Sequence, residues 1–216
     1  MKKQVFVFGI ILILMVAVGV LYILGREPPE DVFDSEGRYD STVLNNMGVI
    51  YENQSDIYAW NNGYSMSDAC PWDSTHYGLD YIFLNNSNVI AAAPGLVETV
   101  HGEFRENATF YQVSVQIRFN STVWINYNFE GFSLDPNVLA QQISMIDVEV
   151  GDWVAKSDVI GRFLQPTIND HVDFTVYLEH ISHIPSCPRL VMGTADYNEL
   201  MILVHSYHPT WELCYP

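Results

Sequence analysis

The stretch Tyr111-Gln-Val-Ser-Val-Gln-Ile-Arg-Phe119 alternates apolar and polar residues along its whole length. Its odd-numbered residues are apolar and its even-numbered residues are polar, so an extended chain would separate them onto two faces. The apolar run from Val123 to Phe129 follows after Asn120-Ser121 and predicts an antiparallel hairpin partner. Together the two runs predict a sheet with one buried face and one solvated face.

Further strands are predicted on both sides of this hairpin, where short apolar runs are separated by Asn-Asn and Pro-Gly turn pairs. These runs are Tyr81 to Leu84, Val89 to Ala93, Leu96 to His101 and His171 to Leu178. Residues 134 to 146 suit either a short helix or a loop. Near the end, Asp196-Tyr-Asn-Glu199 has capping-box spacing and predicts a helix from Asn198 to His208. The pattern predicts an all-β core with one late helix.

The N-terminus carries the strongest local signal in the chain. Val5 to Leu24 is an uncharged apolar run of about 20 residues, which is long enough to cross a bilayer core as a helix. A cleaved signal peptide is the alternative, but its apolar region is shorter and it ends in small residues, whereas this run ends in bulky ones. Lys2 and Lys3 precede the run and only Arg26 closely follows it, which favours a cytoplasmic N-terminus. We therefore predict a cytoplasmic tip (1–4), a transmembrane signal anchor (5–25), an acidic linker (26–45) and an ectodomain (46–216).

Charge and sequons agree with an exported domain. Three of the nine basic residues precede residue 27 and all 26 acidic residues follow residue 26, so the rest of the chain carries a formal charge of about −20. Such a surface repels nucleic acid, and it attracts divalent cations without specifying a site. Four Asn-x-Ser/Thr sequons fit export, at Asn53, Asn85, Asn107 and Asn120. The prediction is a single-pass protein of the cell membrane with an extracytoplasmic C-terminal domain and no nucleic-acid partner.

The three cysteines allow one disulfide and one free thiol. Cys187 lies before the predicted C-terminal helix and Cys214 lies after it, so we expect these two to pair and to hold the helix against the sheet. In the chain-entropy model such a bridge stabilises the fold by about 3 to 4 kcal/mol. Cys70, next to Pro71, is then the unpaired cysteine.

Two short motifs have side chains that could bind a metal. The first is His76-Tyr-Gly-Leu-Asp80, whose His and Asp would lie roughly 13 Å apart on a straight strand. They could share an ion only if the chain bends, which Gly78 permits. The second is His171-Val-Asp173, whose two polar residues share one face of a strand while Val172 faces the core. Taken alone, each motif is more often a surface or hydrogen-bonded pair than a metal site.

The order of these segments resembles the lysostaphin-type, or LytM-like, zinc endopeptidases of cell-wall metabolism. That family opens with His-x-Gly-x-Asp and a strand pair of the form Val-x-Ala-Ala-x-Gly-x-Val, and this chain has His76-Tyr-Gly-Leu-Asp80 and Asn88-Val-Ile-Ala-Ala-Ala-Pro-Gly-Leu-Val97. A glycine-rich hairpin follows, for which this chain has Val148-Glu-Val-Gly-Asp-Trp-Val-Ala-Lys-Ser-Asp-Val-Ile-Gly161. Its Ser157 replaces the usual middle glycine. The family closes with His-x-His-Phe-x-Val, and this chain has His171-Val-Asp-Phe-Thr-Val176.

The resemblance implies a fold and a function. The fold is mostly β, an antiparallel β-sandwich of the duplicated-hybrid-motif type with a C-terminal helix. The implied metal is zinc, with His76, Asp80 and Asp173 at the ligand positions. His171 falls at the position of the histidine that helps to activate the attacking water, which makes it the implied catalytic residue. The implied reaction is hydrolysis of peptide bonds in cell-envelope peptide or glycopeptide.

Two departures from the family leave a second function open. Asp173 replaces a histidine ligand, and although zinc accepts oxygen donors, the added negative charge weakens its Lewis acidity. Another divalent ion could then compete. A further family histidine falls at Phe129, which can neither hold water nor donate to an oxyanion. The alternative is therefore a catalytically degenerate relative, with or without metal, that binds a wall component or an envelope partner protein in the same groove.

Overall fold

The computed structural model of the chain describes residues 43–105, 110–165, 167–178 and 184–216. The predicted cytoplasmic tip, the transmembrane anchor and the linker up to residue 42 lie outside these residues. In the part of the chain that the structure describes, no helix combines the length and the apolar character that a membrane span needs.

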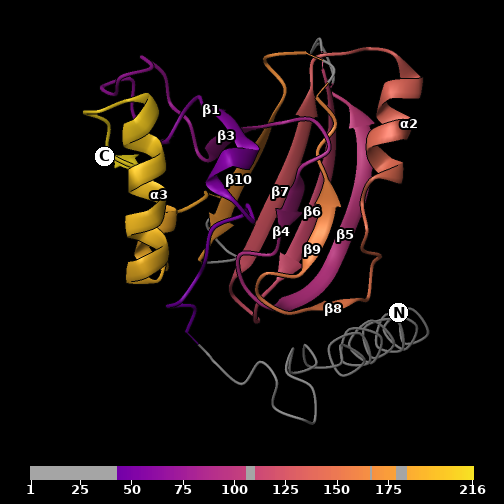
Figure 1. Cartoon of the computed structure of the whole chain (residues 1–216). Helices are drawn as coiled ribbons and strands as arrows, with labels where there is room; N and C mark the ends of the chain where they lie inside the picture. The colour runs from indigo at the N-terminus through magenta and orange to yellow at the C-terminus, as the bar shows by residue number, and fades with distance from the viewer. Residues whose placement is uncertain (1–42, 106–109, 166, 179–183) are drawn as a thin grey trace, which may run out of the picture. The chain divides into compact units, whose positions relative to one another are not determined.

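A seven-stranded sheet with the order β1-β3-β10-β7-β6-β5-β8 forms the centre of the described chain (Figure 1). Every neighbouring pair in it is antiparallel. Its strands are β1 (Ile57–Trp60), β3 (Leu79–Phe83), β5 (Gly95–Phe104), β6 (Tyr111–Arg118), β7 (Trp124–Gly131), β8 (Trp153–Val154) and β10 (His171–Tyr177). The mostly β class predicted from the sequence is confirmed.

The predicted hairpin is the pair β6–β7. It runs in register from Tyr111 opposite Gly131 to Arg118 opposite Trp124. The apolar residues inside β6 are fully buried and the polar ones between them are half-buried, so the predicted alternation is confirmed. In the connecting turn, the Oδ1 atom of Asn120 accepts hydrogen bonds from the backbone N–H groups of the residues two and three positions later. This sequon side chain is therefore engaged within the fold.

The second layer is a two-stranded sheet of β4 (Asn88–Ile90) and β9 (Val159–Arg162). It packs on the buried face of the large sheet, where the ring of Phe163 lies 6.0 Å from that of Phe83 and 6.5 Å from that of Phe129. The core is thus a large sheet covered by a much smaller one, which is a more unequal pair of layers than a β-sandwich implies.

The stretch Val148–Gly161 does not form the expected hairpin. The turn at Gly151-Asp152 is present, and Gly151 has a φ of +100°, which favours glycine. However, β8 pairs with β5 while β9 pairs with β4, so the two strands belong to different sheets. Between them the chain turns at Ser157, whose φ of 76° places a non-glycine residue in the left-handed region.

The α-helices of the described residues, α2 and α3, pack beside the large sheet (Figure 1). Residues 134 to 146 contain the helix α2 (Pro136–Ser144), capped by the Asp135 side chain and packed against β5 and β6. The C-terminal helix α3 (Thr194–Tyr207) begins four residues before the predicted start, with Gly193 at its N-cap. Asp196 therefore lies in the first turn, where it forms an ion pair with Lys156 at 3.1 Å, instead of capping the helix.

The predicted disulfide between Cys187 and Cys214 is confirmed, and Cys70 is buried and free. Cys187 precedes the short 3₁₀ helix η2 (Pro188–Leu190), and another 3₁₀ turn, η1 (Gln54–Asp56), precedes β1. After α3, the strand β11 (Cys214–Tyr215) pairs in parallel with β2 (Tyr64–Ser65). Beside this pair, the ring of Trp72 lies 5.2 Å from that of Trp211 and 5.3 Å from that of Tyr215.

Candidate metal centre

Three of the predicted site residues converge at the β3–β10 pair. Asp80 on β3 lies directly opposite Asp173 on β10. His76 precedes β3 and forms an isolated bridge with Ser65. The His76 Nε2 atom is 3.1 Å from Asp80 Oδ1 and 3.9 Å from Asp173 Oδ1. One ligand atom from each of the three residues lies within 4.8 Å of the other two.

Gly78 makes this convergence possible because its missing side chain leaves room for the Asp173 carboxylate. Gly78 does not have a positive φ; among the described glycines, that conformation is found at Gly151. Gly78 is therefore not needed for a backbone bend that other residues could not adopt. A Cβ atom at Gly78 would instead overlap Asp173 Oδ1 and lie 2.9 Å from Thr175 Cγ2. Only a residue without a side chain lets the Asp173 carboxylate lie against the segment that joins His76 to Asp80.

The orientation of the His76 ring is fixed by the backbone. Its Nδ1 atom is 2.8 Å from the carbonyl oxygen of Gly63. A carbonyl oxygen can only accept, so Nδ1 carries a proton and donates it. The Nε2 atom is left facing the two carboxylates. Metal-binding histidines are commonly held in this way, with the second ring nitrogen donating to a backbone carbonyl.

Each carboxylate is also held by an amide. Asn61 Nδ2 donates to Asp80 Oδ2 at 3.5 Å, and Asn128 Nδ2 donates to Asp173 Oδ2 at 3.4 Å. Asn128 is oriented in turn by two donors on β6, Gln112 Nε2 and Ser114 Oγ, each 2.9 Å from its Oδ1 atom. These bonds engage the Oδ2 atoms and leave both Oδ1 atoms directed at His76.

The donor set fits a divalent cation. The Oδ1 atoms of Asp80 and Asp173 are buried, and among the described residues no amide, hydroxyl or backbone N–H group donates to either of them. Their neighbours are imidazoles: His76 and His171 lie 3.1 and 3.6 Å from Asp80 Oδ1, and His76 lies 3.9 Å from Asp173 Oδ1. Two buried carboxylates this close together are costly, and a cation would satisfy both. Donors around a tetrahedral zinc ion lie roughly 3.3 Å apart, close to the spacings of His76 Nε2 from the two oxygens. One imidazole and two carboxylates suit zinc, and they also suit harder ions such as manganese or calcium.

His171 lies beside this three-residue cluster. Its Nδ1 atom is 2.9 Å from the carbonyl oxygen of Asn169, so this atom donates and Nε2 faces the site. The Nε2 atom is 3.6 Å from Asp80 Oδ1 and 3.5 Å from Glu130 Oε2. The arrangement places an imidazole next to the metal donors and a second carboxylate behind it.

Burial and mutual charge shift the pKa values of these groups. Burial opposes protonation of both imidazoles, but the Asp80 carboxylate outweighs it, raising the pKa of His76 to about 9 and that of His171 above its usual value. Burial together with the charge of Asp80 raises the pKa of Asp173 to about 6. Burial raises the pKa of Glu130 to about 7, although His171 acts against it. For Asp80, burial acts upward, but His171 and His76 outweigh it and lower the pKa. A metal ion must therefore displace a proton from His76.

No protein-family model matches this chain, and no curated protein sequence matches it. Among solved structures, it is similar to the catalytic domain of a point mutant of the prophage-encoded M23 protein EnpA from Enterococcus faecalis, with 17% identity, 62% of this chain and 92% of that chain covered, and a TM-score of 0.45. It is also similar to the catalytic domain of lysostaphin from Staphylococcus simulans, with 16% identity, coverages of 63% and 92%, and a TM-score of 0.41. A zinc-containing peptidase from Vibrio cholerae matches with 17% identity, coverages of 71% and 41%, and a TM-score of 0.43.

The chain is a structural match to M23 and lysostaphin-type catalytic domains at low sequence identity.

The assignment of the missing family histidine to Phe129 is wrong. Phe129 is opposite Val172 in the β7–β10 pair, and both are fully buried in the core. Its neighbour Glu130 is the residue opposite His171. Adjacent residues of a strand point to opposite faces of the sheet. An assignment that is wrong by one position therefore selects a core residue in place of a residue that faces the site. The alternation in β7, where Tyr127 and Phe129 are apolar and the residues between and after them are polar, is the signal that points to Asn128 and Glu130.

Proposed function

We propose that this chain is a membrane-anchored, extracytoplasmic, metal-dependent peptidase that hydrolyses peptide bonds in cell-envelope peptide or glycopeptide. The observation that carries the proposal is the convergence of His76, Asp80 and Asp173, in which two buried carboxylate oxygens face the imidazole of His76 at 3.1 and 3.9 Å. The ordered three-part motif supports the choice of a peptide substrate, and the apolar run from Val5 to Leu24 supports the membrane anchor.

The residues around the cluster have distinct parts in such a reaction. A bound divalent ion would supply Lewis acidity, which polarises a scissile carbonyl and acidifies water. His171 presents Nε2 toward the cluster with Nδ1 fixed on the Asn169 carbonyl, so in the neutral form of the ring Nε2 is the atom placed to accept a proton from the attacking water. Glu130, 3.5 Å from the same nitrogen, stabilises the imidazolium that results.

A second function is favoured by one specific observation. Asp173 gives the donor set two anionic ligands and one imidazole, which weakens the Lewis acidity of a bound ion. A chain of this kind could hold a wall component or an envelope partner protein in the same groove without cleaving it. Glu130 counts against this alternative. With Phe129 at this position the site would lack a polar group beside His171, but the Glu130 carboxylate lies there, 3.5 Å from His171 Nε2.

The function is tested by assaying the full-length chain in detergent on purified wall-peptide crosslinks with added zinc. The wild type should release peptide, and a chelator should stop it. His171→Ala should lower the rate by about 10² or more while zinc binding is largely kept, because general-base catalysis contributes about 10² to 10⁴. His101→Ala is the matched control, since His101 is an exposed histidine on β5. A wild type that binds zinc and the crosslink but never cleaves it would establish the binding function instead.

The proposed membrane topology has its own test. With residues from Glu27 onward outside the cytoplasm, protease added to intact cells should remove the domain, because no membrane would then shield it. The fragment that remains can be followed with a tag placed before Val5. A cytoplasmic marker protein serves as the control and should stay intact. Digestion that occurs only after lysis would contradict the proposed orientation.

A further inference from the structure

We propose that the Cys187–Cys214 disulfide sets the metal affinity of the site by holding His76 in place, so that its reduction weakens metal binding. This inference rests on the metal site of the proposed function. It assigns the disulfide, which contributes no metal ligand, the role of positioning His76.

The first link joins the disulfide to two segments at once. Cys214 begins β11, and the N–H of Tyr64 on β2 donates to the Leu213 carbonyl at 3.0 Å. Cys187 follows Ser186, whose N–H donates to the carbonyl of Val176 on β10 at 2.7 Å. The disulfide therefore ties the β2–β11 pair to the segment that runs along β10, the strand of Asp173.

The second link joins β2 to the metal ligand. The carbonyl of Gly63 accepts the hydrogen bond from His76 Nδ1 at 2.8 Å. The backbone of His76 is bonded to Ser65 in both directions, with its N–H donating to the Ser65 carbonyl at 2.9 Å. His76 lies outside β3, so Gly63 and Ser65 fix both its ring and its backbone. If β11 separates from β2, the support of His76 loosens.

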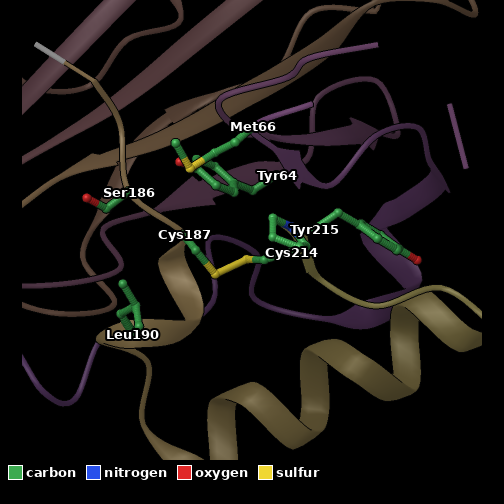
Figure 2. A pocket seen from close by; sticks show the side chains of 8 residues that line it. Tyr64, Met66, Ser186, Cys187, Leu190, Cys214 and Tyr215 are labelled. Atoms are coloured by element: carbon green, nitrogen blue, oxygen red, sulfur yellow. A yellow bond between two sulfur atoms is a disulfide. The ribbon is translucent and has the colours of Figure 1, made fainter. Parts of the chain in front are cut away.

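The disulfide is also open to a reductant. It lines a pocket of about 330 Å³. Figure 2 shows the disulfide together with Tyr64, Met66 and Leu190, which line the same pocket. Both cysteines are partly exposed, and Met66 and Leu190 on the rim are 57% and 70% exposed. A dithiol could donate two electrons and two protons here. The S–S bond would break, Cys187 and Cys214 would become thiols, and the dithiol would close to its own disulfide.

The test compares zinc dissociation constants of the full-length chain in detergent, measured by competition with a chromophoric chelator. The Cys187→Ser/Cys214→Ser double variant should bind zinc about 10- to 100-fold more weakly than the wild type, the range typical of lost support behind a ligand. Serines are used because free thiolates would bind zinc themselves. Cys70→Ser is the matched control and should bind as the wild type does. A folded double variant with wild-type affinity would overturn the proposal.

A second measurement applies even if the double variant does not fold. Hydrogen exchange of the wild type, before and after reduction with a phosphine, should show faster exchange at the amides of Ser65 and His76 after reduction. Unchanged exchange at both amides would overturn the coupling. If the oxidised wild type binds no zinc, the metal site itself fails, while the exchange experiment still decides whether the disulfide supports His76.

Discussion

Replacing Asp80 with alanine should lower zinc affinity by more than about a hundredfold, because the loss of a supporting residue alone costs about 10- to 100-fold and Asp80 is itself a ligand. Its Oδ1 atom lies 3.1 Å from His76 and 3.6 Å from His171, so it is the carboxylate oxygen that both imidazoles share. Zinc stoichiometry and dissociation constant should be measured on the full-length chain. Asp68→Ala, which removes an exposed carboxylate, is the matched control and should leave both values unchanged.

A second variant reaches the same site without removing a ligand. In Gly78→Ala the new Cβ would overlap the Asp173 carboxylate, so zinc affinity should fall in the same direction as in Asp80→Ala. If the wild type and Asp80→Ala retain zinc equally, the metal is bound elsewhere. If the wild type binds no divalent ion, the domain is a metal-free binding module.

Replacing Asp173 with histidine should raise zinc affinity, on the order of tenfold, because a neutral imidazole suits zinc better than a second carboxylate does. It should also create or increase peptidase activity. Phe129 is no obstacle to this gain, because it is buried in the core on the opposite face of β7 from the site. Zinc affinity and the rate of cleavage of a wall-peptide crosslink check the two parts of the prediction separately.

Asp173→Asn is the control for this substitution. It keeps the size of the side chain and removes the charge, so it should bind zinc more weakly than the wild type. The new imidazole must also fit beside Thr175 and against Gly78, which the aspartate oxygen now contacts. If Asp173→His folds but binds zinc no better than Asp173→Asn, position 173 is not a ligand position.

Local patterns in the sequence correctly predict which residues of a single strand share a face. The alternation from Tyr111 to Phe119 gave the correct buried face, and the i, i+2 spacing placed His171 and Asp173 on the site face of β10. The convergence of His76 with Asp173 could not come from spacing, because nearly a hundred residues separate them. It was expected only from the ordered motifs of the family resemblance.

The errors concern features that are set by partners distant in the sequence. A motif match does not fix strand register, so the motif places Phe129 in the site, whereas the pairing of β7 with β10 sets Asn128 and Glu130 opposite Asp173 and His171. The sequence predicts one hairpin over Val148–Gly161, whereas its strands β8 and β9 pair with β5 and β4. In the same way, Asp196 does not cap the helix: its carboxylate forms an ion pair with Lys156, and α3 begins earlier, at Thr194.

The contact of Trp72 with Trp211 and Tyr215 gives the molecule an optical signal of its own. Trp72 lies four residues before His76, and the other two rings belong to the segment that carries Cys214. Separation of that segment would expose indole rings to water, which shifts tryptophan emission to longer wavelengths. Ordinary fluorescence can therefore follow the docking of the C-terminal segment in solution, without a label.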